Sequence, residues 1–163
     1  MLSALLLVTS LCIPRVPRPA SMCSCALRPA SDSARGSDAL QTADAVFVGE
    51  VTSVVDTLVV DTVLPSGPFQ VRGRRATFTV DRGWKGPLAL LITVLTGTGG
   101  SDCGYEFALG QRYLVFATVG ANGILHTRAC SPTQELASAQ QYLLGLGKPR
   151  IRYAPPDSGS KPR

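Results

Sequence analysis

The side chains of this 163-residue chain best suited to chemistry are its cysteines, one in an apolar N-terminal run and four beyond it. Cys12 lies in that run, and the others are Cys23, Cys25, Cys103 and Cys130. If the run is removed on export, an even number of cysteines remains, which favours two disulfides over free thiols. A zinc site fits the four poorly, because Cys23 and Cys25 are only one residue apart and no C-x-x-C pair exists.

The single histidine, His126, is the only imidazole that a catalytic triad could use. It lies on a predicted strand four residues before Cys130. The sequence has no Ser-x-Gly nucleophile elbow whose serine this histidine could activate. A Cys–His enzyme would need Cys130 as a free thiolate, which the disulfide interpretation excludes. We therefore predict that His126 is structural or exposed and that the protein is not an enzyme.

Acidic residues and a glycine-rich segment are the other candidates for chemistry. Glu50, Asp56 and Asp61 alternate with apolar residues at strand spacing, which is typical of a solvated sheet face and not of a carboxylate pair for acid–base catalysis. Residues 97–100 are Gly-Thr-Gly-Gly, but no Lys-Ser/Thr step and no helix follow, as a phosphate loop requires. We interpret this segment as a flexible loop and expect no cofactor.

Residues 1–22 are interpreted as a signal peptide. The apolar run at residues 1–13 is too short to span a bilayer and has the length of a secretory core. This predicts a secreted or periplasmic protein with no stable membrane anchor. Cleavage directly before Cys23 would follow Met22, an unfavourable residue, so cleavage after Ala20 or Ser21 stays open. The alternative is a buried N-terminal strand or helix without export.

Composition bounds the remaining possibilities. With 45% hydrophobic and 17% charged residues the chain fits one compact domain, and 16 glycines and 12 prolines exclude a coiled coil. The net charge of +5 falls to +3 without residues 1–22, because Arg15 and Arg18 are lost with no acid. Arginines cluster only at residues 72–75, and aromatic residues make up 6% of the chain, so we expect no nucleic acid as a partner.

Hydrophobic periodicity predicts the elements that must position the cysteines. Apolar and β-branched residues alternate in five segments, which we predict as strands: 44–57, 70–81, 88–95, 112–119 and 123–127. A short helix is predicted at residues 37–43 with Ser37 as its N-cap. A closing helix is predicted within residues 132–146, with Thr133 as its cap, and residues 148–163 are predicted to be a disordered proline-rich tail.

These elements predict a mainly β fold. Five strands with glycine-marked bends and two short helices favour a small five-stranded Greek-key barrel of the OB type, although other barrels and a β-sandwich fit the periodicity as well. Trp84, at the end of a strand, is expected to close the barrel core; its alternative role is an exposed aromatic for binding.

Several short motifs occur together in one order: Cys23-Ser24-Cys25-Ala26, Ala43-Asp44-Ala45-Val46-Phe47-Val48-Gly49, Trp84-Lys85-Gly86-Pro87, Cys103-Gly104 and Thr127-Arg128-Ala129-Cys130-Ser131. In this order and spacing the sequence resembles the N-terminal domain of the tissue inhibitors of metalloproteinases, which belongs to the netrin-like family of OB fold. The resemblance covers roughly residues 23–146 and implies a domain at residues 23–147.

The resemblance implies a disulfide pairing and a reactive edge. It pairs Cys23 with Cys103 and Cys25 with Cys130. In the family, the α-amino group and carbonyl oxygen of the first cysteine chelate the catalytic zinc of a protease, while the next side chain enters the specificity pocket. The edge implied here comprises Cys23, Ser24, Cys25, Ala26, Ser101, Asp102 and Cys103.

The functional hypothesis is therefore a secreted, monomeric inhibitor of zinc metalloendopeptidases. Only the backbone amine and carbonyl of Cys23 would touch metal, and that metal would be the zinc of the target protease. The alternative is a non-inhibitory extracytoplasmic module of the same fold that binds a protein or has a structural role, with Trp84 and the arginines at residues 72–75 as its contact surface.

Overall fold

The first helix and the strands follow each other along the chain in the order that the sequence predicts. A computed structural model describes residues 23–25, 32–61, 69–99, 102–120 and 123–153. Its elements are α1 (Asp32–Thr42), β1 (Ala45–Asp61), β2 (Phe69–Lys85), β3 (Leu91–Thr96), β4 (Arg112–Val119), β5 (Leu125–His126), β6 (Gln134–Glu135), the 3₁₀ helix η2 (Leu136–Ser138), α2 (Gln140–Leu146) and β7 (Ile151–Arg152). The protein is mainly β, as predicted.

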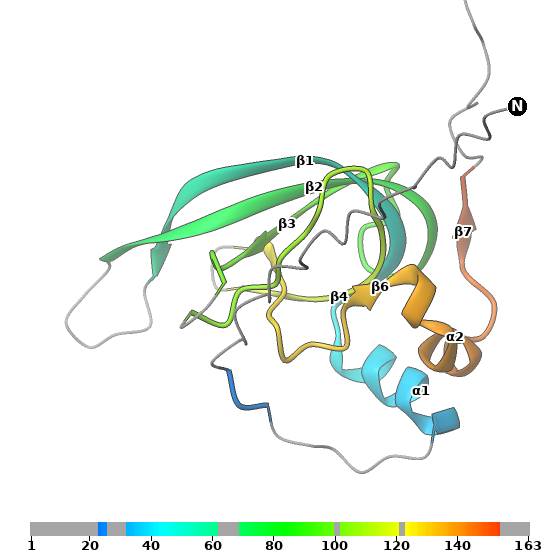
Figure 1. The fold of residues 1–163 in the computed structure, drawn as a ribbon. Helices are drawn as coiled ribbons and strands as arrows, with labels where there is room; N and C mark the ends of the chain where they lie inside the picture. The colour runs from blue at the N-terminus through cyan, green and yellow to red at the C-terminus, as the bar shows by residue number, and fades with distance from the viewer. Residues whose placement is uncertain (1–22, 26–31, 62–68, 100–101, 121–122, 154–163) are drawn as a thin grey trace, which may run out of the picture.

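Five strands form a sheet that closes on itself (Figure 1). The order is β1-β2-β3-β5-β4, and β4 pairs back onto β1 from Ala45↔Ala117 to Glu50↔Arg112. Every pairing in the ring is antiparallel except β3 with β5, which meet in parallel at Leu95↔His126. The short strands β6 and β7 add to β4 and β2.

Side chains inside the ring form the principal core. Aromatic residues at its centre meet edge to face: Phe47 with Phe78 at 5.4 Å between ring centroids, and Phe78 with Phe107 at 5.0 Å. Alternation places Phe47, Val51 and Phe78 inward, because successive strand residues face opposite sides of the sheet. Such pairs stabilise the core by about 1 kcal/mol beyond their buried area.

A second core lies between the outside of the ring and the two helices. Val46, Val48 and Leu114 alternate with the inward residues and pack under α1 and α2. Trp84 belongs to this cluster: it is 6% exposed, and its Nε1 donates a hydrogen bond to the carbonyl of Gly147 at 2.9 Å. Trp84 is therefore buried as expected and is not an exposed binding aromatic, but it lies in the cluster outside the ring, where it contacts the end of α2, and not in the barrel core.

β1 and β2 are longer than predicted. The register between them shifts at three places, between Val46 and Phe47, between Val48 and Gly49, and between Val51 and Ser53. Such bulges increase twist, so the strands can bend round the ring and continue past it. Gly49 is required at the bend, because a Cβ there would lie 2.8 Å from the carbonyl oxygen of Thr79. The outer parts of β1 and β2 leave the ring as a two-stranded ribbon (Figure 1).

The helix caps predicted from the sequence are wrong. α1 begins at Asp32, so Ser37 lies inside the helix and its hydroxyl donates to the carbonyl of Ala34 at 2.9 Å. Residues 132–146 do not form one helix: β6 and η2 come first, and α2 begins only at Gln140. Thr133 is buried, and its hydroxyl bonds to the backbone of Phe116 on β4 instead of capping a helix.

The predicted disordered tail is ordered over its first residues. Ile151 and Arg152 form β7 against Gly83 and Arg82, and the hydroxyl of Tyr153 donates to the carbonyl of Leu88 at 2.7 Å. Residues 154–163 lie outside the described residues, as does the predicted signal peptide. No helix in the part of the chain that the structure describes is long and apolar enough to cross a membrane.

Candidate functional site

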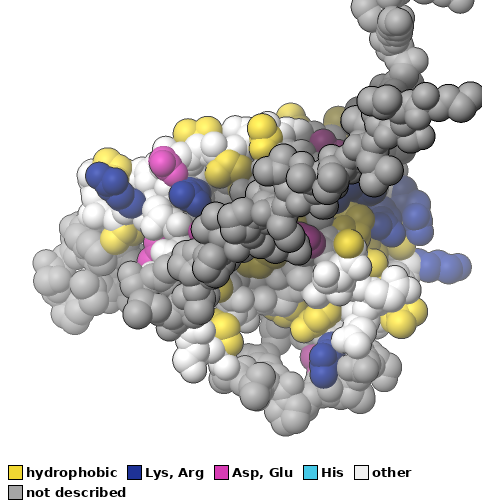
Figure 2. All heavy atoms as spheres, viewed as in Figure 1, with side chains coloured by type: hydrophobic (Ala, Val, Ile, Leu, Met, Phe, Trp, Pro, Cys, Tyr) yellow, Lys and Arg dark blue, Asp and Glu magenta, His cyan; other side chains and the backbone are white. Residues whose placement is uncertain are grey.

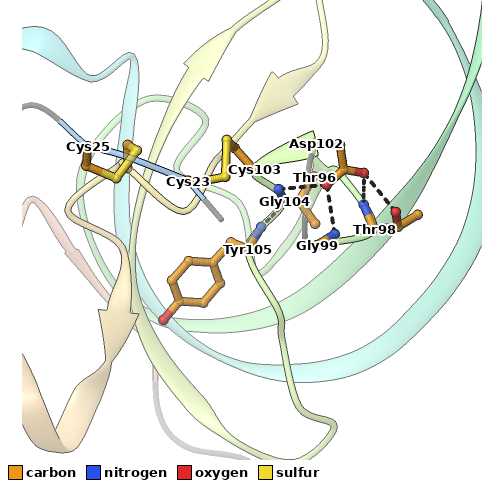
Figure 3. Close-up of a disulfide and its surroundings, with 10 residues drawn as sticks. Cys23, Cys25, Thr96, Thr98, Gly99, Asp102, Cys103, Gly104 and Tyr105 are labelled. Carbon is orange, nitrogen blue, oxygen red and sulfur yellow. Dashed lines mark hydrogen bonds between the residues drawn. A yellow bond between two sulfur atoms is a disulfide. The ribbon is translucent and has the colours of Figure 1, made fainter. Parts of the chain in front are cut away.

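The candidate site is built around residues 23–25, which two disulfides hold against the ring (Figure 3). Cys23 is bonded to Cys103, with 5.5 Å between their Cα atoms, and Cys25 to Cys130, with 5.3 Å. These are the two pairs that the family resemblance implies. Disulfide bonds indicate a non-reducing, extracytoplasmic compartment.

Asp102 organises the loop that carries Cys103. Its carboxylate accepts hydrogen bonds from the backbone N–H groups of Thr98, Gly99 and Gly104 at 2.6, 2.9 and 3.0 Å, and from the Thr98 hydroxyl at 2.8 Å (Figure 3). The loop is thus folded around one side chain. Cys103 has a φ of 54°, which an L residue adopts only where its surroundings impose it.

Two glycines allow the loop to close this tightly. A Cβ on Gly104 would lie 2.3 Å from the carbonyl carbon and oxygen of Gly97, and one on Gly97 would lie 2.6 Å from the Asp102 carboxylate. In the segment predicted as a flexible loop, residues 97–100, the backbone N–H groups of Thr98 and Gly99 are therefore both bonded to Asp102. Residue 100 lies outside the described residues.

The electrostatics of Asp102 follow from these contacts. Burial acts to raise the pKa of the carboxyl group, but the hydrogen bonds from Thr98, Gly104 and Gly99 favour its ionised form more strongly, and the net effect lowers the pKa below its ordinary value. Asp102 is accordingly a carboxylate at neutral pH, and its charge is used within the loop.

The second disulfide is anchored on an equally ordered segment. The N–H of Ala129 donates to the carbonyl of Cys103 at 2.8 Å, so the two disulfide-bearing segments are joined directly. Behind them, the buried hydroxyls of Thr127 and Thr133 both donate to the carbonyl of Phe116, at 3.0 and 3.1 Å. Residues 23–25 therefore rest on two segments that are each held to the ring.

The structure brings together only some of the residues expected at the reactive edge. Cys23 is half-buried, whereas Ser24 and Cys25 are exposed beside it. Asp102 and Cys103 lie next to Cys23 through the disulfide. Ala26 and Ser101 lie outside the described residues. Among the described residues, no group of three or more His, Cys, Asp or Glu side chains could hold a metal ion.

The other residues considered for chemistry lie elsewhere. His126 is half-buried on β5, where β3 and β4 flank it. Asp56 is on the β1–β2 ribbon and pairs with Arg74, with 3.2 Å between Oδ1 and Nε. Sequence reasoning missed Asp81, which forms an ion pair with Arg112 across the sheet, because these residues are 31 positions apart and no local pattern joins them.

Sequence reasoning also missed the organising role of Asp102. An Asp placed shortly after Gly-Thr-Gly-Gly could have indicated a loop closed on a carboxylate, because Asp side chains accept hydrogen bonds from nearby backbone N–H groups.

Comparison with known proteins found no match: no protein-family model and no curated protein matches the sequence. The candidate site therefore rests on the geometry described above.

Proposed function

We propose that this protein is an exported inhibitor of zinc metalloendopeptidases and that its ring of strands is an OB-type barrel. The order β1-β2-β3-β5-β4 closing on β1, with β3 and β5 parallel, supports the barrel type. The observation that carries the function is the double attachment of residues 23–25 to residues 102–104 and 128–131.

Zinc chelation would use the backbone of Cys23 after removal of residues 1–22. The zinc of a protease keeps one position for water, and a neutral amine with the carbonyl of the same residue makes a five-membered chelate that can take that position. The amine must lose its proton first, and its reference pKa is near 8 (roughly 7.7 to 8.0). Inhibition should therefore weaken in acid.

Rigidity is what the disulfides contribute to such a mechanism. A flexible N-terminus would lose conformational entropy on entering an active-site cleft, whereas one fixed at both Cys23 and Cys25 has already lost it. Between them Ser24 is exposed, as a side chain that enters a specificity pocket must be. The loop around Asp102 stands next to it as a second contact surface.

The proposal is tested with two chains that differ by one residue. The first begins at Cys23 and the second carries one additional Ala before it; both are refolded, and intact mass before and after reduction checks that each holds two disulfides. Each is assayed against a panel of zinc metalloendopeptidases at neutral pH and in mild acid. We expect inhibition by the first chain only, because the added residue converts the amine into an amide.

Two results would contradict the proposal. One is the absence of inhibition by a correctly bonded chain that begins at Cys23, across the whole panel. The other is equal inhibition by both chains, which would show that the amine is not used. N-terminal sequencing of the exported protein supplies the remaining condition, since a chain that begins at Met22 or earlier cannot chelate through Cys23.

The alternative proposal is a non-inhibitory binding module of the same fold. The feature that favours it is the β1–β2 ribbon, on which Val55 and Leu58 are exposed apolar side chains. Trp84 is buried and is no part of that surface. For such a module, the additional Ala before Cys23 would leave partner binding unchanged.

A further inference from the structure

A groove lies where the β1–β2 ribbon leaves the ring. It has a volume of about 520 Å³ and is lined by Asp56, Thr57 and Leu58 of β1, Arg72, Gly73 and Arg74 of β2, and Thr98. We call it the arginine groove. Figure 2 shows basic and hydrophobic side chains close together over the part of the molecule where β1 and β2 lie.

The ribbon has unpaired strand edges on both sides of this groove. β3 pairs with β2 only from Arg74 to Thr79, and β4 pairs with β1 only from Ala45 to Glu50. Within the described residues no further strand pairs with either one beyond these limits, apart from β7 at the opposite end of β2. Unpaired edges of this kind accept an extended segment of another chain.

Side chains in the groove continue the inner face of the barrel. Ala76 and Phe78 face the core, so Arg74 and Arg72, two and four residues before Ala76, lie on the same face of β2. On β1 their partners are Asp56 and Leu58. Arg75 lies between Arg74 and Ala76 and therefore on the opposite face. Beyond the ring, the face of β1 and β2 that is turned to the barrel core therefore carries two arginines, one carboxylate and one apolar side chain.

Charge on this face is unbalanced. Asp56 contacts Arg74 through Nε alone, and its side chain is 83% exposed. Among the described residues Arg72 has no carboxylate within ion-pair distance. Two guanidinium groups two residues apart on a strand are about 7 Å apart along it, which is also the spacing of alternate side chains in an extended peptide. Leu58 is 63% exposed beside them.

We propose that the arginine groove binds an extended acidic segment of a partner protein, in which Glu or Asp residues alternate with apolar residues. The carboxylates would meet Arg72 and Arg74, since guanidinium groups bind carboxylates in a planar two-bond arrangement. Leu58 would pack against the methylene groups of these acidic side chains, and the apolar side chains of the segment would lie on the opposite face of the ribbon, where Val55 is exposed. The exposed Leu58 disfavours a uniform polyanion such as a sulfated polysaccharide, because such a polymer offers no apolar group to cover it.

The test uses the whole exported protein and three labelled probes. The first is an acetylated peptide amide of alternating Glu and Val with four residues of each. The second has the same composition with all Glu in one block and all Val in another. The third is a heparin-derived oligosaccharide. Binding is followed by fluorescence anisotropy at physiological ionic strength, where long-range attraction between exposed charges is screened.

Two variants with the same charge change report on the surface used. Arg72→Gln removes a guanidinium from the groove, and Arg75→Gln removes one from the opposite face of the same strand. We expect Arg72→Gln to weaken binding of the alternating peptide at least fivefold and Arg75→Gln less than twofold. Equal far-ultraviolet circular dichroism spectra check that both variants keep the sheet.

Three outcomes would overturn the proposal. The first is that the alternating peptide does not bind measurably. The second is that Arg72→Gln and Arg75→Gln weaken its binding equally. The third is that the block peptide or the oligosaccharide binds as tightly as the alternating peptide. The last would identify a general polyanion surface. The groove does not use the α-amine of Cys23, so this result is independent of protease inhibition and is obtained equally with a chain extended before Cys23.

Discussion

Asp102 accepts two hydrogen bonds from Thr98, one from its backbone N–H at 2.6 Å and one from its hydroxyl at 2.8 Å. The residue that follows Asp102 is the disulfide partner of Cys23. The carboxylate therefore fixes the position of Cys103, and through the disulfide it fixes the N-terminal residue of the proposed inhibitor. In this arrangement Asp102 acts as a positioning residue for Cys23.

Replacing Asp102 with Asn should loosen this loop in a pH-dependent way. Asn keeps the shape but loses the charge, and its NH2 group cannot accept the two hydrogen bonds made by one of the carboxylate oxygens, so we expect a loss of about 1 to 3 kcal/mol in the free energy of unfolding at pH 7. Because the folded-state pKa of Asp102 is lowered from 3.8, the stabilisation is present above that value and is lost as pH falls through the folded-state pKa. Urea unfolding at neutral and strongly acidic pH should show the two proteins converging in acid. A difference that persists in acid would contradict the charge argument.

Tyr105 should ionise later than an ordinary tyrosine. Burial raises its pKa to about 12, and Tyr113 and Glu135 add to the effect. Since the folded state favours the neutral phenol, this contribution to stability is complete below pH 10 and is lost as pH rises toward 12. Ultraviolet difference titration should show a tyrosine ionisation step at that pH, and Tyr105→Phe should remove this step.

The same substitution supplies the matching stability measurement. Tyr105→Phe retains the ring that packs against Phe107 at 4.8 Å and Tyr113 at 5.9 Å between centroids. We expect the variant and the unchanged protein to unfold alike at pH 8 and the variant to lose less stability on going to pH 11. Equal loss in both proteins would assign the alkaline transition to another group.

The strands of the barrel could be predicted because their signal is local. Alternation in residues 112–119 gives β4 with the bounds that the structure shows. The first strand, predicted at residues 44–57, begins one residue later and continues four residues further, to Asp61. The pattern specifies which side chains face inward. It does not specify that β4 returns to pair with β1, a contact between segments more than 60 residues apart.

The errors fall where a remote partner overrides a local preference. Thr133 has the sequence context of a helix cap, but the carbonyl of Phe116 on β4 takes its hydroxyl. Ile151 stands in a segment of tail-like composition, yet it gains pairing with Gly83 on β2. At the candidate site, the cysteines and Asp102 could be named from the sequence, whereas the use of the Asp102 carboxylate depends on backbone geometry that spacing alone does not show.

A comparison of Gly86 with Gly110 separates two costs of adding a side chain, the backbone strain at positive φ and the steric overlap of the new Cβ with its neighbours. Both have positive φ, at 90° and 75°. A Cβ on Gly110 would meet nothing within 4 Å, so Gly110→Ala should cost only the backbone strain, about 1 to 2 kcal/mol. A Cβ on Gly86 would lie 2.7 Å from the Cβ of Ala45, which is fully buried, so β1 would have to move.

We therefore expect Gly86→Ala to lower the free energy of unfolding by clearly more than Gly110→Ala, by about 3 kcal/mol or beyond. Urea unfolding of both variants, followed by the fluorescence of the single tryptophan, Trp84, gives the comparison. Equal costs would mean that the chain at Gly86 moves away from Ala45 at little expense.

Removing either disulfide should cost less than its own loop length indicates, because the two bonds share a constraint. Alone, bonds that close 80 and 105 residues would each contribute about 4 to 5 kcal/mol in the chain-entropy model. With the Cys25–Cys130 bond in place, the Cys23–Cys103 bond closes only a short loop, made of the step of 2 positions from Cys23 to Cys25 and the step of 27 positions from Cys103 to Cys130. A loop of about 30 residues corresponds to roughly 3 to 4 kcal/mol.

The pairs are removed as Cys23→Ser with Cys103→Ser, as Cys25→Ser with Cys130→Ser, and all four together, with intact mass checking the remaining bond. Each double variant should lose about 3 to 4 kcal/mol in urea unfolding. The fourfold variant should lose more than twice as much free energy of unfolding as either double variant, because the disulfide removed second closes the longer loop when it is the only one left. Since domains of this size have about 5 to 15 kcal/mol in total, the fourfold variant should be close to unfolded at 25 °C. Strictly additive losses would show that the constraint acts in the folded state and not in the unfolded chain.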